Sequence, residues 1–189
     1  QLDVFANDKD GRLLQLRVHH GDGPDGPWSA QVVRRLQLDS QPEGCVVDEV
    51  TQTLFVGEEK RGIWRVALNT ENAAPELVVP VGGTLHADVE GLAIYHGKAG
   101  EHYLVVSSQG NDSYLVLDAT APYTLRAAFR VGINAHAGID ATSETDGLAA
   151  TAANLGAPYG QGLLVVQDGH KRLPQGTQNF KLIAWSDVM

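Results

Sequence analysis

The chain has 189 residues, of which 43% are hydrophobic and 21 are glycine, a composition typical of one turn-rich globular domain. Its formal net charge of -9 argues against general nucleic-acid binding, which needs clustered lysine and arginine. Cys45 is the only cysteine, so no disulfide can form within the chain. No stretch approaches the ~20 apolar residues of a membrane helix, so no membrane partner is expected.

The sequence begins directly on a strand-like pattern, with no initiator methionine and no signal-peptide pattern at Gln1. We therefore expect a processed protein or a piece of a longer one. Strand patterns are short and frequent, whereas no window keeps the spacing of an amphipathic helix. Turn residues such as Asp10-Gly11 and Gly82-Gly83 separate them. In chain order, 13 strands are predicted, at 13–18, 31–38, 45–48, 53–56, 63–68, 76–81, 92–95, 103–107, 114–117, 125–131, 148–151, 163–166 and 180–185.

A repeat places a charged or amide residue at the end of an apolar strand four times. The segments Val4–Lys9, Leu54–Glu59, Leu104–Gln109 and Leu163–Asp168 align, and their ends are separated by 50, 50 and 59 residues. A period near fifty with several strands per repeat is typical of a β-propeller, in which equivalent strand ends gather around one axis. The repeat therefore predicts a polar ring whose residue types suit oxygen ligation of a hard cation such as Ca²⁺.

A second repeat supports the same unit. Glu43-Gly44, Glu90-Gly91 and Asp146-Gly147 each open a predicted strand. At four strands per blade, 13 strands make about three blades and a remnant, fewer than the roughly four to eight that close a propeller. We expect residues 1–189 to be the C-terminal portion of a single propeller whose N-terminal blades are absent. Closure of the arc by a partner copy is the alternative.

Carboxylates crowd the repeat boundaries. Asp88 and Glu90 lie two residues apart on an extended strand and so point to the same face. Neighbouring carboxylates repel and commonly share a cation or a proton. Each acid taken alone is better explained as a solvated turn residue, but their repetition favours a metal site. The full set is Glu43, Glu58, Glu59, Asp88, Glu90, Asp140, Glu144, Asp146 and Asp168.

Several segments together resemble the beta-propeller phytases, the alkaline calcium-dependent phytases of bacteria. The resemblance runs from about Val4 to the C-terminus and implies a six-bladed propeller. It rests on Gln41–Gly44, Gly57–Glu59, Asp88–Leu92, Ser107–Tyr114, Thr145–Gly147, Gln167–Gly169 and Gln178–Lys181.

The resemblance also implies roles for individual residues. The catalytic calcium cluster corresponds to Glu43, Glu59, Asp88, Glu90 and Gln109, and Asp146 matches an acidic residue of the same site. Asp140 and Asp168 match ligands of calcium ions that stabilise the fold, and Lys9 matches a lysine that contacts substrate phosphate. The sequence departs from the family pattern at His170, which would weaken the nearby calcium site. It also departs at Lys60-Arg61, where Arg61 would add a phosphate contact unless the pair is simply a solvated turn.

The function implied is that of a calcium-dependent 3-phytase, a phosphomonoester hydrolase that releases phosphate from phytate supplied as calcium-phytate. A metal-activated water would attack phosphorus. The protein would be secreted or periplasmic, and the isolated fragment would be inactive if the missing blades complete the site. The alternative is a non-catalytic or incomplete calcium- and phytate-binding module that assists a complete phytase domain, such as a second propeller in the full-length protein. A propeller lactonase is a weaker option, which the Asp88–Gly91 and Ser107–Asn111 motifs disfavour.

Other candidate residues are interpreted as structural. Cys45 lies in an apolar strand and is interpreted as a core residue rather than a nucleophile. No zinc-type ligand pattern surrounds His19-His20. The remaining histidines near turns, namely His86, His96, His102 and His136, are interpreted as surface residues.

Overall fold

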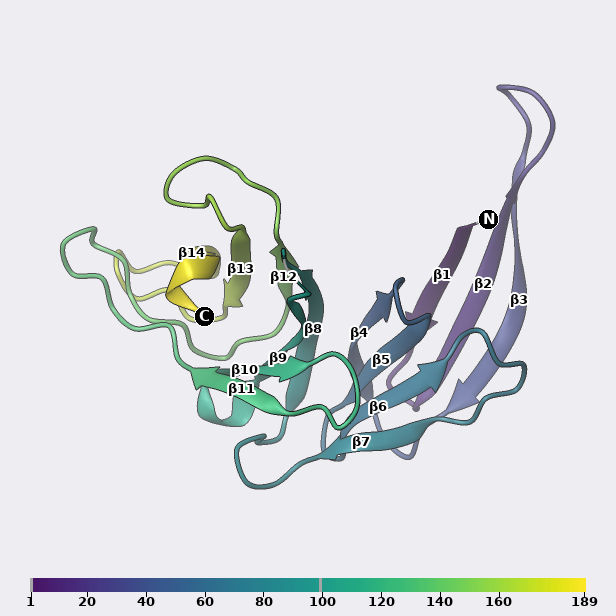
Figure 1. Cartoon of the computed structure of the whole chain (residues 1–189), viewed down its shortest axis with the longest axis horizontal. Helices are drawn as coiled ribbons and strands as arrows, with labels where there is room; N and C mark the ends of the chain where they lie inside the picture. The colour runs from purple at the N-terminus through teal and green to yellow at the C-terminus, as the bar shows by residue number, and fades with distance from the viewer. Residues whose placement is uncertain (1, 99) are drawn as a thin grey trace.

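The computed structural model describes residues 2–98 and 100–189, which form four antiparallel sheets that follow one another around an arc in chain order (Figure 1). The first sheet contains β1 (Leu2–Asn7), β2 (Arg12–His20) and β3 (Trp28–Gln37). The second contains β4 (Pro42–Asp48), β5 (Thr53–Glu58), β6 (Gly62–Ala67) and β7 (Glu76–Pro80). The third contains β8 (Val89–His96), β9 (His102–Ser108), β10 (Ser113–Asp118) and β11 (Leu125–Phe129). The fourth contains β12 (Leu148–Thr151), β13 (Leu163–Asp168) and β14 (Asn179–Ala184).

The predicted all-β fold built of propeller blades is confirmed, and each of the 13 predicted strands overlaps an observed strand. The division into blades differs from the expected three blades and a remnant, because two sheets have four strands and two have three. The segment Leu2–Asn7 pairs with β2, which agrees with the strand pattern of the repeat that ends at Lys9. Hydrogen-bond pairing, rather than the number of strands, assigns each strand to its sheet.

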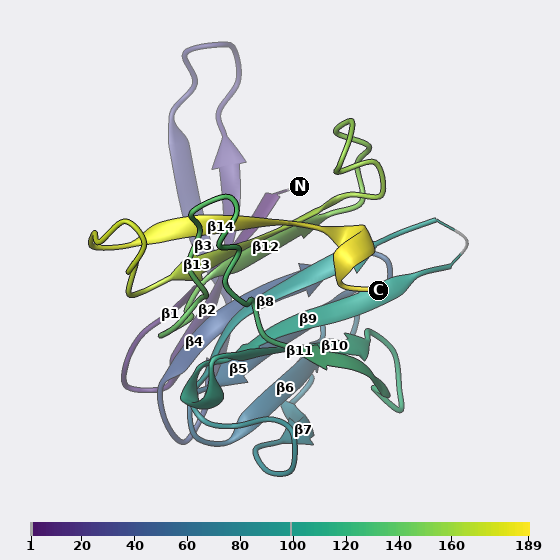
Figure 2. The ribbon, with the colours of Figure 1, turned by 90° about the vertical axis from the view of Figure 1, so that its left-hand side faces the viewer.

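The innermost strands of three sheets lie side by side, since β4 packs on β8 and β8 packs on β12. Backbone hydrogen bonds join these sheets. The Val89 amide donates to the Glu59 carbonyl at 3.0 Å, and the Gly91 amide donates to the Asp146 carbonyl at 3.1 Å. The hairpin of β2 and β3 projects away from the other sheets, as the side view makes clear (Figure 2).

Three hydrophobic clusters lie between neighbouring sheets. The first and second sheets share a cluster around Leu13 and Leu54, and the second and third share one around Phe55 and Leu104. Between the third and fourth sheets, the rings of Tyr95 and Trp185 stack with centroids 3.6 Å apart. Complete burial of one large apolar side chain stabilises a fold by about 1.5–3 kcal/mol, so these clusters hold adjacent blades in fixed relation.

Two short 3-10 helices follow strands, at Gln109–Asn111 and Trp185–Asp187. Neither these nor any other helix in residues 2–98 and 100–189 has the length and apolar character needed to cross a bilayer.

Candidate metal centre

Three acidic side chains from two neighbouring sheets meet at one end of the strands. Glu43 lies near the start of β4, Glu59 directly follows β5, and Glu90 lies near the start of β8. One carboxylate oxygen from each lies within 4.8 Å of the others. Glu90 is buried, with 8% of its surface exposed, whereas Glu43 and Glu59 are half-buried. Glu59 from the first predicted repeat and Glu43 and Glu90 from the second therefore converge on one cluster.

A local irregularity of the sheet occurs at the same place in both blades. The register of β4 with β5 shifts around Glu43-Gly44, and the register of β8 with β9 shifts around Glu90-Gly91. Such β-bulges re-aim a side chain relative to a regular strand. Both bulges coincide with acidic residues of the cluster.

The glycine after each acidic residue allows the next blade to approach closely. A Cβ atom on Gly44 would lie 2.2 Å from the Glu90 carbonyl oxygen, and one on Gly91 would lie 2.5 Å from the Asp146 carbonyl oxygen. Both distances are too short for any side chain to be accepted without movement of the backbone. The close approach of the backbones thus links Glu43, Glu90 and Asp146 in sequence around the arc.

The cluster concentrates negative charge where water is partly excluded. Burial, as the largest cause, and the charges of Glu43, Asp146, Asp88 and Glu59 together raise the pKa of Glu90 to about 8. Desolvation and like charges both disfavour the ionised carboxyl group, and a bound cation would reverse this effect. The donor set is made only of oxygen atoms, which suits a hard cation such as Ca²⁺.

Gln109 and Asp146 extend the same site. The Gln109 side-chain amide donates to Asp146 Oδ1 at 2.6 Å, and the Asp146 backbone amide donates to Gln167 Oε1 at 2.9 Å. Burial raises the pKa of Asp146, the hydrogen bond from Gln109 lowers it, and Glu43 and Glu144 raise it further. The backbone carbonyl of Asp88 accepts a hydrogen bond of 2.9 Å from the backbone amide of Gln109, so Asp88 lies beside the end of β9.

The raised pKa of Glu90 predicts an unusual pH dependence in the absence of metal. Between the ordinary pKa of 4.5 and the folded-state value of about 8, the folded chain retains a proton that the unfolded chain has lost. The free energy of unfolding should therefore decrease as the pH rises through this window, and level off above it. Urea unfolding in a chelator at about pH 5, 7 and 9 measures the trend. A midpoint that stays constant or rises across these pH values would contradict the burial of an uncompensated charge.

The two predicted phosphate-binding residues lie near the site but are exposed. Lys9 follows β1, and the end of β1 is held beside β4 by a hydrogen bond of 2.5 Å from the Asn7 side-chain amide to the Pro42 carbonyl. Arg61 follows Glu59 by two residues and pairs with Asp39 at 3.3 Å. Within residues 2–98 and 100–189, neither cation forms an ion pair with the acidic cluster, so their role toward phosphate stays a prediction.

Asp140 and Asp168 form a separate buried group. Lys181 Nζ donates to Asp140 Oδ1 at 2.7 Å and to Asp168 Oδ2 at 2.8 Å. The bond from Lys181 and backbone amides of the loop after β13, including that of Arg172, hold the pKa of Asp140 well below its ordinary value. Burial alone lowers the pKa of Lys181, but the two carboxylates more than offset this effect and leave it raised. The ammonium group of Lys181 thus occupies the position between the two carboxylates, and their role as calcium ligands stays a prediction.

Removal of this ammonium group should be costly. In Lys181→Met the carboxylates of Asp140 and Asp168 would face each other without a cation, so we expect a loss of about 3–5 kcal/mol in the free energy of unfolding. Urea denaturation measures the loss, and the exposed Lys60→Met is the matched control. Recovery of stability in Lys181→Met on addition of calcium would support the two acids as metal ligands. A loss equal to that of the control would refute the importance of the buried group.

One cluster was not predicted from the sequence. His96 and His102, interpreted as surface residues, both face the buried carboxylate of Asp48. That interpretation is wrong for His102, whose side chain is 17% exposed. The two histidines flank the turn between β8 and β9 and are register partners, a pairing that the hairpin pattern alone could have indicated.

Comparison with known proteins agrees with this architecture. The fold and the site define an arc of β-propeller blades with an acidic cluster that could hold a metal ion. The family model named Phytase matches residues 4–189, and the chain belongs to this family. Over 190 residues it is 36% identical to the 3-phytase of Bacillus subtilis (strain 168), a match that covers 98% of this chain and 48% of that protein. The chain thus spans about half the length of the relative.

Proposed function

We propose that this chain is part of a calcium-dependent 3-phytase, a phosphoric monoester hydrolase that releases phosphate from phytate. The observation that carries the proposal is the acidic cluster itself. Glu43, Glu59 and Glu90 each place one carboxylate oxygen within 4.8 Å of the others, and the pKa of Glu90 is raised to about 8. Such a site repels a polyanionic substrate unless cations intervene. The family membership and the 3-phytase relative support phytate as the substrate.

The acidic residues would act as the calcium-binding part of the catalytic site. Glu43, Glu59, Asp88 and Glu90 would hold the ions through carboxylate oxygens, and Gln109 through its amide oxygen. Calcium, once bound, supplies positive charge against phosphate oxygens and lowers the pKa of bound water. Asp146 would orient Gln109 by accepting the 2.6 Å hydrogen bond from its side-chain nitrogen. Because this contact uses the nitrogen, the side-chain oxygen of Gln109 stays available to bind an ion.

Lys9 and Arg61 would contact the phosphate groups. Both are exposed and follow strands that end at the same edge as the acidic cluster. A lysine or arginine there would stabilise negative charge on the equatorial phosphate oxygens during transfer. We expect Lys9→Ala to impair phosphate release more than calcium binding, which isothermal titration with calcium and a phosphate assay would separate.

A second candidate function is a non-catalytic or incomplete module that binds calcium and phytate beside a complete propeller domain. It is favoured by the fact that the match covers 48% of the relative. We propose that the parent protein contains further blades N-terminal to this segment. Secretion to the periplasm or the medium, where a bacterium would meet calcium-phytate, is part of the same proposal.

The deciding experiment is phosphate release from calcium-phytate by this chain and by its parent protein, each with and without a calcium chelator. Chelator-sensitive release by both would support the hydrolase and make the other blades dispensable. Release by the parent alone would support an incomplete site. Phytate binding without release by either would support the second candidate and refute the first.

A further inference from the structure

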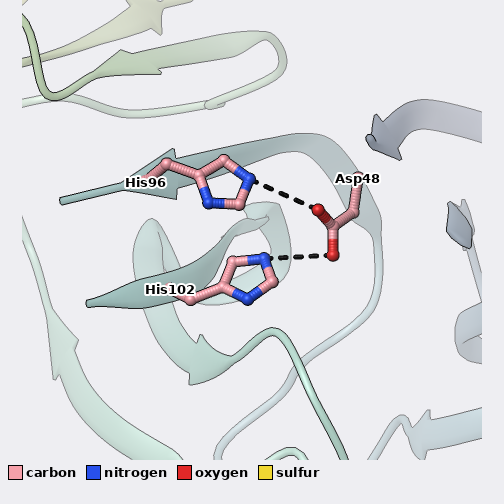
Figure 3. A group of neighbouring side chains, drawn as sticks. All are labelled: Asp48, His96 and His102. Carbon is pink, nitrogen blue, oxygen red and sulfur yellow. Dashed lines mark ion pairs between the residues drawn. The ribbon is translucent and has the colours of Figure 1, made fainter. Parts of the chain in front are cut away.

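A second candidate metal site lies at the opposite end of the same strands. The rings of His96 and His102 stack with centroids 4.2 Å apart, and both direct a nitrogen toward Asp48 (Figure 3). His96 Nε2 lies 3.3 Å from Asp48 Oδ1, and His102 Nε2 lies 3.0 Å from Asp48 Oδ2. One ligand atom from each of the three residues lies within 4.8 Å of the others.

The position separates this group from the acidic cluster. Asp48 ends β4 and His96 ends β8, whereas Glu43 and Glu90 lie near the starts of those strands. Five residues of extended chain span about 16 Å. The two groups therefore cannot share one ion.

Charge pairing alone accounts poorly for the arrangement. Asp48 is fully buried, and its single negative charge faces two imidazole rings. If both rings were protonated, two stacked cations would repel each other. Among the described residues, buried His102 Nε2 has no hydrogen-bond partner, although it lies 3.0 Å from a carboxylate oxygen. Two ligand atoms of one metal ion lie close together without being aligned for a hydrogen bond to each other. His102 Nε2 and Asp48 Oδ2 have this relation.

The distances suit a transition metal. Zinc binds histidine nitrogen and carboxylate oxygen at about 2.0–2.2 Å, so two ligands of one tetrahedral ion lie roughly 3.4 Å apart. Imidazole together with one carboxylate favours zinc and similar ions over calcium. We propose that Asp48, His96 and His102 form a binding site for a divalent transition-metal ion of the zinc type.

The surroundings support a built site. Ligating carboxylates are commonly oriented by hydrogen bonds from neighbouring groups. Asp48 accepts from the Val50 amide at 3.1 Å and from the Thr51 hydroxyl group. His96 is 42% exposed and lines a cavity of about 470 Å³ between the innermost strands β4, β8 and β12. His96 is therefore the member of the group that water reaches through this cavity.

Bound zinc would join the end of β4 to the hairpin of β8 and β9, and so connect the second and third sheets at the face opposite the acidic cluster. A ligand that binds only the folded state stabilises it by mass action. Zinc should therefore raise the melting temperature of the chain even when calcium already saturates the acidic cluster.

The test is zinc binding in a large excess of calcium, measured by competition with a chromogenic chelator. We expect one zinc ion per chain. Since loss of an outer partner already costs 10–100-fold in metal affinity, His96→Ala and His102→Ala should each cost more than about 100-fold. His136→Ala removes an exposed histidine elsewhere and should leave the affinity unchanged. Cobalt in place of zinc should give the visible absorption of a tetrahedral site, and His102→Ala should abolish it.

The melting temperature without zinc checks the fold of each variant. His96→Ala removes a partly exposed side chain and should have the melting temperature of the unmutated chain. The test therefore stays valid if His102→Ala is unstable. Absence of zinc binding in excess calcium would overturn the proposal. Equal zinc affinity of the unmutated chain and the folded His96→Ala variant would also overturn it.

Discussion

Replacement of Glu90 by glutamine is expected to lower the rate of phosphate release from calcium-phytate by more than about 100-fold, because it removes a charged metal ligand. The same change should raise the stability of the metal-free chain above about pH 8. Glutamine has nearly the shape of glutamate but no charge to desolvate, whereas Glu90 is buried among four other acids. The opposite signs of these two effects separate a metal ligand from a residue that merely supports the fold.

Initial rates of phosphate release, calcium titration and urea unfolding at about pH 9 measure the three quantities. The parent protein is used for the rates if the chain alone is inactive. Glu71→Gln changes an exposed glutamate in the turn before β7 and should leave all three unchanged. Unchanged phosphate release in both Glu90→Gln and Gln109→Ala would exclude the acidic cluster from catalysis.

The second large effect is expected at the glycines that follow the acidic residues. Gly44→Ala should destabilise the chain by about 3 kcal/mol, because its Cβ atom would lie 2.2 Å from a backbone oxygen of the neighbouring blade. Backbone on both sides of the contact is held in sheets, so relief would require the blades to separate. Calcium affinity should fall as well, because Glu43 and Glu90 are positioned across that contact.

Gly147→Ala supplies a matched control from the same motif. A Cβ atom on Gly147 would have no neighbour within 4 Å, and its backbone has no positive φ angle. We expect a change within about 0.5 kcal/mol in this chain. Urea midpoints of the two variants provide the comparison. Equal destabilisation would mean that the cost comes from the local backbone of the strand rather than from contact between blades.

Much of the fold could be predicted from the sequence, since strands depend on local patterns. Alternating apolar residues and turn residues define the hairpins without reference to the rest of the chain. The repeat of Glu43-Gly44 and Glu90-Gly91 also predicted that two acids occupy equivalent positions, and the structure brings them together. A repeated supersecondary unit places equivalent residues at equivalent positions, which is why spacing alone identified them.

Spacing could not predict the direction of each side chain. Asp168 is the last residue of β13, whereas Glu59 lies one residue beyond the end of β5. Successive residues of an extended strand face opposite sides, so Glu59 joins the acidic cluster and Asp168 points to the buried ammonium group of Lys181. Alignment of the apolar residues alone did not reveal this offset of one residue.

Strand propensities and turn signals therefore specified the type of fold, the order of strands and the repeated acidic positions. Packing of one blade on another raised the pKa of Glu90 and brought Asp48 to His96 and His102. Folding of the fourth sheet with the loop before β12 placed Lys181 between Asp140 and Asp168. These features arise from contacts between residues far apart in sequence, where burial and electrostatic interaction depend on distances that exist only after the chain has folded.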